Sequence, residues 1–352
     1  MNEQLELREF SPKIHSDREI LASFLTRHQL KYEEDIEYAV GFCEDGQLLA
    51  CGCCSGPLLK CFAVEPQLRG QNILGRIVSA LVANRFKAGY FEPIVFTRAC
   101  NREIFVNCGF YPVAETEDLV FLEHRFDGIE RFISSLKSMD DLGKKAGAII
   151  VNCNPFTKGH RYLVEYASAN CELLHIFVVQ ENRSAFPFDI RFRLVEQGVS
   201  DLQNVQVHAG GNYIISSATF PSYFLKKEDD SVKAQAKLDA TLFASRIASP
   251  LNINVRFVGT EPNCAVTKQY NTILKSVLPR FGIEVVEIDR CNTMDGEVIS
   301  ASRVRRLLAE GILDKSLLKL VPESTYRYLT SPEAAPVIEK LRNRERVNGT
   351  GP

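Results

Sequence analysis

The feature that most constrains this chain is a strand, a tight loop and a helix start near its middle. The apolar run Ala146–Val151 leads directly into the loop Asn152–His160, and an amphipathic stretch follows from Arg161. This succession is typical of an α/β unit. The N–H groups and the dipole of a helix N-terminus attract phosphate, and Gly159 lets the backbone approach a ligand closely. The loop therefore predicts a phosphate-binding site.

Side chains in two distant segments suit chemistry at phosphorus. His160 can donate a hydrogen bond to a phosphoryl oxygen as charge builds during displacement. Far downstream, the segment Glu297–Arg306 has the pattern of a loop that leads into a helix, with Ser300 and Ser302 suited to cap it and three arginines following. Guanidinium groups at a helix start bind phosphate well. Together the segments predict attack on the α-phosphate of ATP.

These segments resemble the two signatures of the nucleotidyltransferase superfamily. The first signature, (H/T)-x-G-H, is matched by Thr157–His160, and the second, I-S-x-(S/T)-x-x-R, by Ile299–Arg305. The chain after residue 146 alternates apolar strand patterns with helical ones, which predicts a doubly wound, Rossmann-like parallel sheet. Ligands of such sheets bind beyond the carboxyl ends of the strands, where the first signature lies.

The composition of the chain restricts the number of domains, the kinds of partner and the cellular compartment that we expect. With 352 residues the chain is long enough for two domains, and its net charge of −2 gives no hint of a nucleic-acid partner. No apolar run reaches membrane-spanning length and the N-terminus lacks a signal-peptide pattern, so we expect no membrane partner. The eleven cysteines then indicate reduced thiols in the cytoplasm. We expect the cluster Cys51, Cys53, Cys54 and Cys61 to be buried free thiols rather than a zinc site.

The first 125 residues predict a separate α+β domain that resembles the GNAT acetyltransferase fold. The resemblance rests on Val64-x-Pro-x-x-Arg-Gly70 before a helix and on Asn101 with Phe105-x-x-x-Gly-Phe110 near the end. In that family the first loop holds the pyrophosphate of coenzyme A. Here Asn72 and Leu74 replace two of its glycines, and Gly75 comes one position late. Three roles stay open: a scaffold, binding of a coenzyme A-like arm through Arg69, Gly70 and Gly75, or N-acetyl transfer.

The predicted organisation is therefore α/β with two domains. We expect a GNAT-like domain over residues 1–125, a linker helix and hinge over 126–145, a nucleotidyltransferase domain over 146–330, and a C-terminal tail over 331–352. A helix expected near Val232–Ile247 falls in the second domain of this scheme.

Taken as a whole, the chain resembles the citrate lyase ligase family, which also has a GNAT-like domain ahead of a nucleotidyltransferase domain. The matching stretches are Asn152–His160, Phe177–Asn182, Tyr213–Phe224 and Phe257–Pro262. The resemblance implies an AMP-forming acid–thiol ligase that uses ATP, with Mg²⁺ bound through the phosphates, and acetate. Its partner would be the acyl carrier subunit of citrate lyase, whose thiol belongs to a derivative of dephospho-coenzyme A. Acetylation of that thiol through acetyl-adenylate activates the lyase.

The resemblance also implies roles for individual residues. His160 would contact the α-phosphate, Thr157 would supply a hydroxyl to the same phosphates, and Lys158 would neutralise charge on the β- and γ-phosphates. We expect no metal ligand in the protein. The phosphate-binding set would be Asn154, Phe156, Gly159, Ser300, Ser302, Arg303 and Arg305. Gly259, Thr260 and Glu261 would border the adenosine. An acetate and thiol-arm pocket would comprise Tyr213, Ser216, Ser217 and Thr219.

Several other side chains fall outside these sets. Arg191 and Arg193 lie two positions apart on a helix and cannot share one face, so at most one points inward, and we choose Arg191. His175 and His208 are expected in the fold rather than in a site, and Cys153 in packing.

Three competing functions remain open from sequence. The first is an adenylyltransferase that joins AMP to a phosphorylated cofactor precursor, because it would share both signatures. The second is a protein N-acetyltransferase that uses acetyl-coenzyme A without ATP. The third is a carrier-binding regulator with no ATP turnover.

Overall fold

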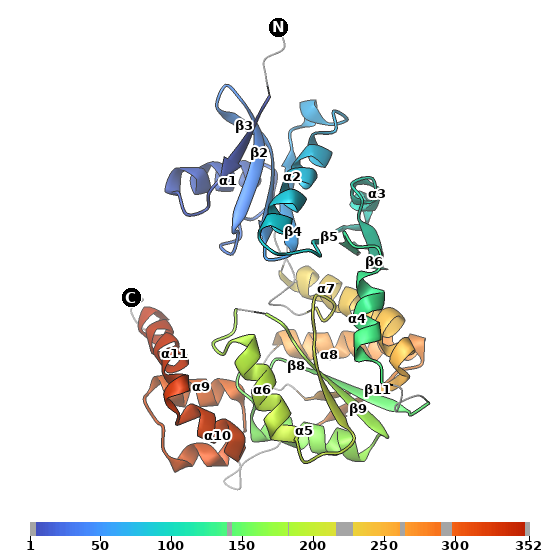
Figure 1. Cartoon of the computed structure of the whole chain (residues 1–352), viewed down its shortest axis with the longest axis vertical. Helices are drawn as coiled ribbons and strands as arrows, with labels where there is room; N and C mark the ends of the chain where they lie inside the picture. Colours follow the sequence, from blue (N-terminus) through green and yellow to red (C-terminus); the bar gives the residue numbers. More distant parts are fainter. Residues whose placement is uncertain are drawn as a thin grey trace. The chain divides into compact units, whose positions relative to one another are not determined.

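The structure is a computed structural model that describes residues 5–138, 143–181, 183–215, 228–260, 265–289 and 298–348. Its chain forms two compact units (Figure 1). The first comprises residues 1–132 and 220–242, and the second comprises residues 133–219 and 243–352. Helix α4 (Gly128–Leu136) spans the change from one unit to the other. None of the helices in the described ranges is long and apolar enough to cross a membrane.

The first unit is built on a mixed sheet with the strand order β1-β2-β3-β4-β5-β7-β6. Its pairs are antiparallel except β4 and β5, which run parallel and pair only at Leu58–Ile94 and Leu59–Val95. Asp45 and Gly46 both adopt positive φ and close the β2–β3 hairpin, as an Asp-Gly turn requires. The strands are β1 (Glu6–Phe10), β2 (Tyr38–Glu44), β3 (Gln47–Ser55), β4 (Leu58–Val64), β5 (Ile94–Arg98), β6 (Tyr111–Glu115) and β7 (Leu119–Glu123).

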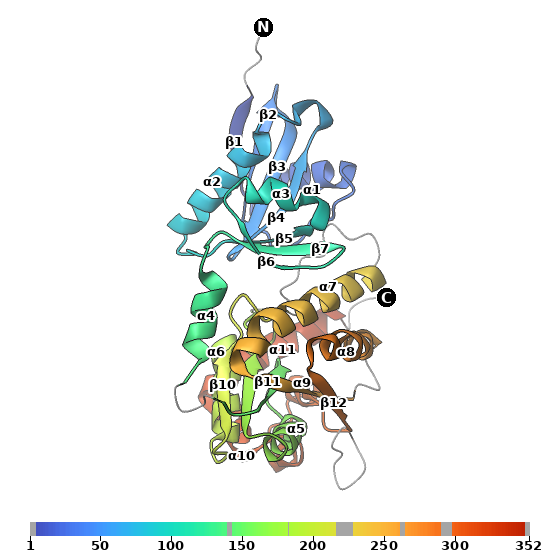
Figure 2. The same cartoon turned by 90° about the vertical axis from the view of Figure 1, so that its right-hand side faces the viewer.

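Helices pack against this sheet in the first unit (Figure 2). Helix α2 contacts β2, β3 and β4, and its apolar residues join a core with Val40, Phe42 and Leu59. Helix α1 contacts β3 and buries Leu21, Phe24 and Leu25. The helical segments are α1 (His15–Arg27), η1 (Pro66–Leu68), α2 (Ile73–Lys87), η2 (Ala99–Asn101), α3 (Arg102–Val106) and α7 (Glu228–Leu242). The α+β class expected for this part of the chain is confirmed.

Helix α7 belongs to the first unit although it follows most of the second-unit sheet in sequence. It contacts β6 and β7, and Lys237 forms an ion pair with Glu117. The sequence predicts a helix near Val232–Ile247 among the second-domain elements, whereas the structure divides that segment. The α-helix ends at Leu242 in the first unit, and the π-helical turn η4 (Phe243–Ala248) belongs to the second. The exact domain boundaries stay a prediction.

The second unit contains a parallel sheet with the strand order β10-β9-β8-β11-β12. Chain order reverses beside β8, so crossovers run in both directions from it, which is the doubly wound topology that the sequence predicts. The fold class is therefore confirmed. The strands are β8 (Ala146–Val151), β9 (Leu173–Val178), β10 (Val205–Ala209), β11 (Ile253–Gly259) and β12 (Glu284–Ile288).

Helices α5 and α6 cover one face of this sheet and share a core with the C-terminal helices. Helix α5 contacts β8, β9 and β11, while α6 contacts β10 and α8 contacts β12. Helix α11 packs on α9, and its Val337, Ile338 and Leu341 are part of the core beneath α5 and α6. The segment predicted as a tail thus carries core residues. The helices are α5 (Lys158–Ala169), α6 (Phe188–Val199), α8 (Ala265–Val277), α9 (Ala301–Ala309), α10 (Glu323–Leu329) and α11 (Ala335–Asn348).

Short helical turns complete the second unit, namely η5 (Ser249–Leu251), η6 (Leu278–Phe281), η7 (Lys315–Lys319) and η8 (Pro332–Ala334).

The cysteine cluster lies inside the first sheet. Cys51, Cys53, Cys54 and Cys61 occupy β3 and β4, are fully buried, and carry free thiols. Burial raises the pKa of the Cys54 thiol to about 12, so it stays protonated at neutral pH. The prediction of buried free thiols is confirmed.

Candidate active site

The loop after β8 ends in a reciprocal cap at the start of α5. Thr157 is the N-cap residue, and its Oγ1 accepts a hydrogen bond from the backbone N–H of His160 (3.3 Å). In return, Nδ1 of His160 accepts from the backbone N–H of Thr157 (3.0 Å) and lies 2.9 Å from Thr157 Oγ1. Because an accepting Nδ1 carries no proton, the neutral imidazole has its proton on Nε2. The cap thus sets both the tautomer and the position of His160.

The His160 ring is also held by packing. It stacks on Phe156, with ring centroids 5.8 Å apart and an interplanar angle of 16°. Phe156 is fully buried and lies against Gly198 of α6, where an added Cβ would meet Phe156 Cε1 at 2.3 Å. Gly198 therefore provides the space for the ring on which His160 stacks.

The second signature lies beside the first. Ser300 is the N-cap of α9 and accepts a hydrogen bond from the backbone N–H of Arg303 (3.2 Å), as its capping prediction requires. A Cβ on Gly159 would lie 3.2 Å from the carbonyl oxygen of Ile299, so the two backbones meet at these residues. Only glycine allows this approach without displacing a neighbour. Two motifs about 140 positions apart in sequence therefore lie side by side in the structure.

Arg305 links the two signatures through its side chain. Its Nη1 donates to the carbonyl oxygen of Asn154 (2.5 Å), and its Nη2 donates to Ser302 Oγ (3.0 Å). The backbone N–H of Lys158 donates to Leu320 O (2.9 Å), whereas the Lys158 side chain is exposed. The loop after β8 is thus attached to two C-terminal segments.

An open cavity of about 480 Å³ adjoins the start of α9. Three residues predicted to bind phosphate, namely Ser300, Ser302 and Arg303, line it together with Val298 and Arg306. Arg306 was not among the predicted site residues, although its position three residues after Arg303 puts both on one helical face. Two guanidinium groups and two hydroxyls make the cavity suitable for a polyanion.

The predicted adenosine residues lie at the carboxyl end of β11. The backbone N–H of Thr260 donates to Ile288 O (2.8 Å), and Asn271 Nδ2 donates to Gly259 O (3.0 Å). Among the residues that the structure describes, none has an atom within 4 Å of the position that a Cβ of Gly259 would take. Glu261 lies outside the described residues.

The predicted acetate and thiol-arm pocket is described only at its first residue. Tyr213 is buried and follows β10 in sequence, three residues after Gly210. The backbone N–H of Gly210 donates to Val178 O (2.9 Å). Ser216, Ser217 and Thr219 lie outside the described residues. Their grouping around a ligand stays a prediction.

The chain is similar in sequence to known proteins over most of its length. The family model for the citrate lyase ligase C-terminal domain matches residues 146–329. The citrate (pro-3S)-lyase ligase of Klebsiella pneumoniae is 40% identical over 317 residues, which cover 89% of this chain and 92% of the relative. This chain belongs to the citrate lyase ligase family. It is accordingly a ligase, as the sequence predicts.

Solved structures of two kinds are similar to parts of this citrate lyase ligase family member. A bifunctional NMN adenylyltransferase/ADP ribose pyrophosphatase from Francisella tularensis has a TM-score of 0.39 and 16% identity, and the match covers 59% of this chain and 57% of that one. An acyl-CoA N-acyltransferase from Pseudomonas aeruginosa has a TM-score of 0.31 and 13% identity, and the match covers 35% of this chain and all of that one.

The first-unit loop predicted to hold a prosthetic arm is exposed in this ligase. Arg69 and Gly70 are exposed, and Gly70 adopts φ +80°. Asn72 is the N-cap of α2 in the left-handed region, without a side-chain capping hydrogen bond. Its Oδ1 lies 2.3 Å from the Cβ position of Gly75, so the amide covers that glycine.

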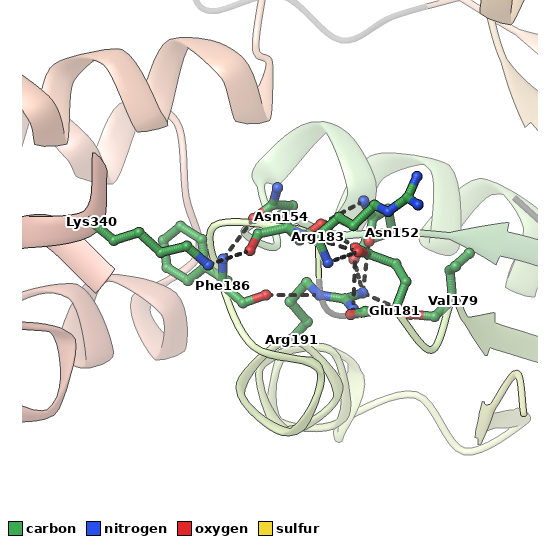
Figure 3. A network of polar contacts seen from close by, with 9 residues as sticks. Asn152, Asn154, Val179, Glu181, Arg183, Phe186, Arg191 and Lys340 are labelled. Atoms are coloured by element: carbon green, nitrogen blue, oxygen red, sulfur yellow. Dashed lines mark hydrogen bonds and ion pairs between the residues drawn. The ribbon is translucent and has the colours of Figure 1, made fainter. Parts of the chain in front are cut away.

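The remaining predictions concern residues expected to be structural. Arg191 is fully buried at the carboxyl ends of β8 and β9 (Figure 3), whereas the Arg193 side chain is exposed and pairs with Glu333 (2.5 Å). The choice of Arg191 as the inward residue is confirmed. His175 Nδ1 lies 2.9 Å from His208 Nε2, between neighbouring strands β9 and β10. Cys153 is buried, and burial raises the pKa of its thiol, which makes it a poor nucleophile.

Proposed function

We propose that this protein uses ATP to acetylate the prosthetic-group thiol of the citrate lyase acyl carrier subunit, and thereby activates citrate lyase. The observation that carries the proposal is the close approach of Gly159 to Ile299, which joins two phosphate-binding signatures beside one cationic cavity. Membership of the citrate lyase ligase family supports the choice of substrates. The nine described cysteines are free thiols, which suits a reducing cytoplasm.

The proposed reaction has two steps. An acetate oxygen attacks the α-phosphorus of ATP, the bond from that phosphorus to the β-phosphate bridge oxygen breaks, and pyrophosphate leaves with its electron pair. The carrier thiol then loses its proton to solvent and its sulfur attacks the acetyl carbonyl carbon, the bond from that carbon to the phosphate oxygen breaks, and AMP leaves with the electron pair. Neither step needs a nucleophile from the enzyme, so catalysis consists of positioning and charge stabilisation. Cys153 has no part in this scheme.

His160 is the proposed donor to the α-phosphate. With its proton on Nε2, the ring can donate to a phosphoryl oxygen while Nδ1 stays bound to Thr157. The Thr157 hydroxyl is bound to His160 and is 2% exposed, so we propose that it holds the imidazole in place beside the phosphates. The exposed Lys158 ammonium would neutralise charge on the β- and γ-phosphates.

The pyrophosphate is proposed to leave into the cavity at the start of α9. Ser300, Ser302 and Arg303 would bind it there. Arg305 is bound to Asn154 and Ser302, so its proposed contribution is to keep the two phosphate segments together. Phe156 supports the His160 ring, and Gly159 permits the close approach of both backbones.

The other substrate groups would lie at neighbouring strand ends. We propose that Gly259, Thr260 and Glu261 border the adenosine, because they lie at or beyond the carboxyl end of β11, the edge of a parallel sheet where ligands bind. The acid and the thiol arm would enter near Tyr213, Ser216, Ser217 and Thr219.

Mg²⁺ is proposed to arrive with the nucleotide. Among the described residues no group of three or more His, Cys, Asp or Glu side chains has the arrangement to hold a metal ion. The donor set near the cavity is cationic and hydroxylic, which suits phosphate oxygens rather than a cation. Bound to the phosphates, Mg²⁺ would neutralise their charge.

The first unit is proposed to bind the prosthetic arm of the carrier. Arg69 and Gly70 are exposed just before α2 and Gly75 lies in the first turn of that helix, where helix N–H groups can meet the phosphate of a dephospho-coenzyme A derivative. Scaffolding and N-acetyl transfer are the alternatives for this unit.

Product analysis tests the proposal against the adenylyltransferase alternative. The full-length protein is incubated with ATP, Mg²⁺ and hydroxylamine, with and without acetate. We expect AMP, pyrophosphate and acetyl-hydroxamate to form only with acetate. ATP turnover without acetate dependence, or AMP incorporated into a phosphorylated acceptor, would overturn the proposal in favour of the alternative.

A further inference from the structure

Arg191 of α6 is fully buried, yet each nitrogen of its guanidinium group has an acceptor. Nε donates to Phe186 O (3.1 Å) and Nη2 donates to Glu181 O (2.8 Å). Nη1 donates to Asn152 O (2.8 Å), Asn152 Oδ1 (2.7 Å) and Val179 O (2.9 Å). A planar fork with five N–H groups fits this arrangement, and a lysine ammonium does not.

The acceptors belong to two separate loops (Figure 3). Asn152 begins the loop after β8, which leads to His160, and residues 179–181 and 183–186 lie between β9 and α6. Parallel strands end at the same edge of a sheet, so the guanidinium lies where both loops leave it. Arg191 therefore joins the His160 loop to its neighbour.

A buried carboxylate balances the charge of this guanidinium. Glu181 Oε1 lies 3.5 Å from Arg191 Nη2, and Glu181 is 6% exposed. The backbone N–H groups of Arg183 and Ser184 donate to Glu181 Oε2 (2.5 and 2.9 Å). Removing one partner of such a pair leaves an uncompensated buried charge, so the whole network depends on both.

Further bonds connect the two loops around Arg191. Asn152 Nδ2 donates to Ser184 Oγ (3.0 Å), and the backbone N–H of Phe186 donates to Asn154 Oδ1 (3.1 Å). Asn154 is the residue whose carbonyl accepts from Arg305. The path from Arg191 to the phosphate segments is therefore continuous through Asn152 and Asn154.

We propose that Arg191 is a positioning residue for adenylate formation, which holds the loop of His160 in one arrangement while charge builds on the α-phosphate. This inference rests on the proposed function. We do not place Arg191 in contact with substrate, because its guanidinium N–H groups donate to protein acceptors. Its effect would fall on the transition state more than on ATP binding, since none of the acceptors of Arg191 lines the cavity at α9.

The test compares Arg191→Lys with Arg193→Lys, a matched change on the same helix at an exposed position. For Arg191→Lys we expect kcat for acetate-dependent pyrophosphate release to fall about 100-fold while the KM for ATP changes less than about threefold, because small misplacements of reacting groups cost rates of this order. Arg193→Lys should keep both constants within about twofold of wild type. Equal kcat in folded Arg191→Lys and wild type would overturn the inference.

A second variant keeps the test decisive if Arg191→Lys does not fold. Asn152 is exposed, so Asn152→Ala should fold, and it removes one acceptor of Arg191 and the bond to Ser184. We expect a fall in kcat of about tenfold for this variant. Unchanged kcat here would equally contradict the inference.

Amide hydrogen exchange, measured by mass spectrometry, separates this inference from the proposed function. In Asn152→Ala, and in Arg191→Lys if folded, residues 152–160 and 179–186 should exchange faster than in wild type, whether or not acetate is a substrate. A wild-type protein without acetate-dependent turnover would refute the proposed function alone. Unchanged exchange in both loops would refute the role of Arg191 alone.

Discussion

The chain contains two loops that join a strand to a helix and that were both predicted to bind phosphate, yet they are restrained differently. In Arg69–Gly75 of the first unit, hydrogen bonds run to residues no more than four positions away. In Asn152–His160 of the second unit, they also run to Ser184, Arg191 and Arg305, and to the backbone of Leu320. The first loop is held by its own helix start, and the second by much of its unit.

This difference teaches what each loop is suited to do. A loop fixed from several sides keeps its donors in place at the moment of reaction, which is what electrostatic catalysis requires. An exposed loop whose hydrogen bonds run only to nearby residues can bind a phosphate group, but few contacts fix the position of its side chains against a reacting atom. We therefore expect chemistry at His160 and recognition at Arg69.

The largest effect is expected from His160→Ala. Loss of a donor to the transition state should lower the rate of acetyl-adenylate formation about 100- to 1,000-fold. The same assay on Arg69→Ala should give a rate close to wild type. A near-wild-type rate in His160→Ala would remove the ring from the mechanism and break the contrast between the loops.

A smaller effect is expected from Gly198→Ala, which tests packing behind the second loop. The added methyl group would meet the buried Phe156 ring at 2.3 Å and press it toward His160. Alanine gains about 1 kcal/mol over glycine in a helix, whereas overpacking costs about 1–3 kcal/mol. We expect the cost to prevail, with a lower Tm and about tenfold slower adenylate formation.

Ser200→Ala is the matched control, because Ser200 is exposed just after the same helix. It should leave Tm and rate unchanged. A more stable and fully active Gly198→Ala would show that the Phe156 ring moves without affecting His160.

A modest effect is expected from Arg69→Ala on transfer to the carrier. Loss of one exposed cation should raise the KM for the carrier up to about fivefold, with adenylate formation unchanged. This point change is preferable to removing residues 1–140, because that deletion would leave α7 without β6 and β7. Transfer kinetics identical to wild type would instead favour a scaffold role for the first unit.

The smallest effect concerns an ion pair that holds the start of α5. Arg161 donates to both carboxylate oxygens of Asp201 (2.6 and 2.7 Å) and holds the pKa of Asp201 at about 2. Because the pKa of Asp201 is lower in the folded state, the ion pair stabilises the fold fully at pH values above the ordinary carboxyl pKa of about 4. This contribution is lost as the pH falls toward 2. Asp201→Asn should therefore lower Tm slightly at pH 7 but not near pH 2. An equal Tm difference at both pH values would contradict this origin.

The two helix starts beside the second loop could be predicted because a helix N-terminus has local sequence signals, whereas the long-range bonds of this loop to Ser184, Arg191 and Arg305 could not. A Thr followed three positions later by a His at a helix start forms the observed cap, and Ser300 caps α9 as its position in a loop before a helix indicates. The helix begins at Lys158, inside the segment Asn152–His160 that the sequence presents as a loop, because Thr157 is its N-cap.

Other features depend on contacts that no local pattern encodes. The helical pattern of α7 predicts a helix, but its buried face is rich in small residues such as Ala236 and Ala240, which could pack on either sheet. The buried residues of α11 likewise follow from a partner helix far away in sequence.

The most direct test of the central claim is isotope exchange between pyrophosphate and ATP in the full-length protein. If the joined signatures form acetyl-adenylate reversibly, labelled pyrophosphate should enter ATP only when acetate and Mg²⁺ are present, and His160→Ala should abolish nearly all of this exchange. Pyrophosphate–ATP exchange at the same rate with and without acetate, or acetate-dependent release of ADP without such exchange, would contradict the account.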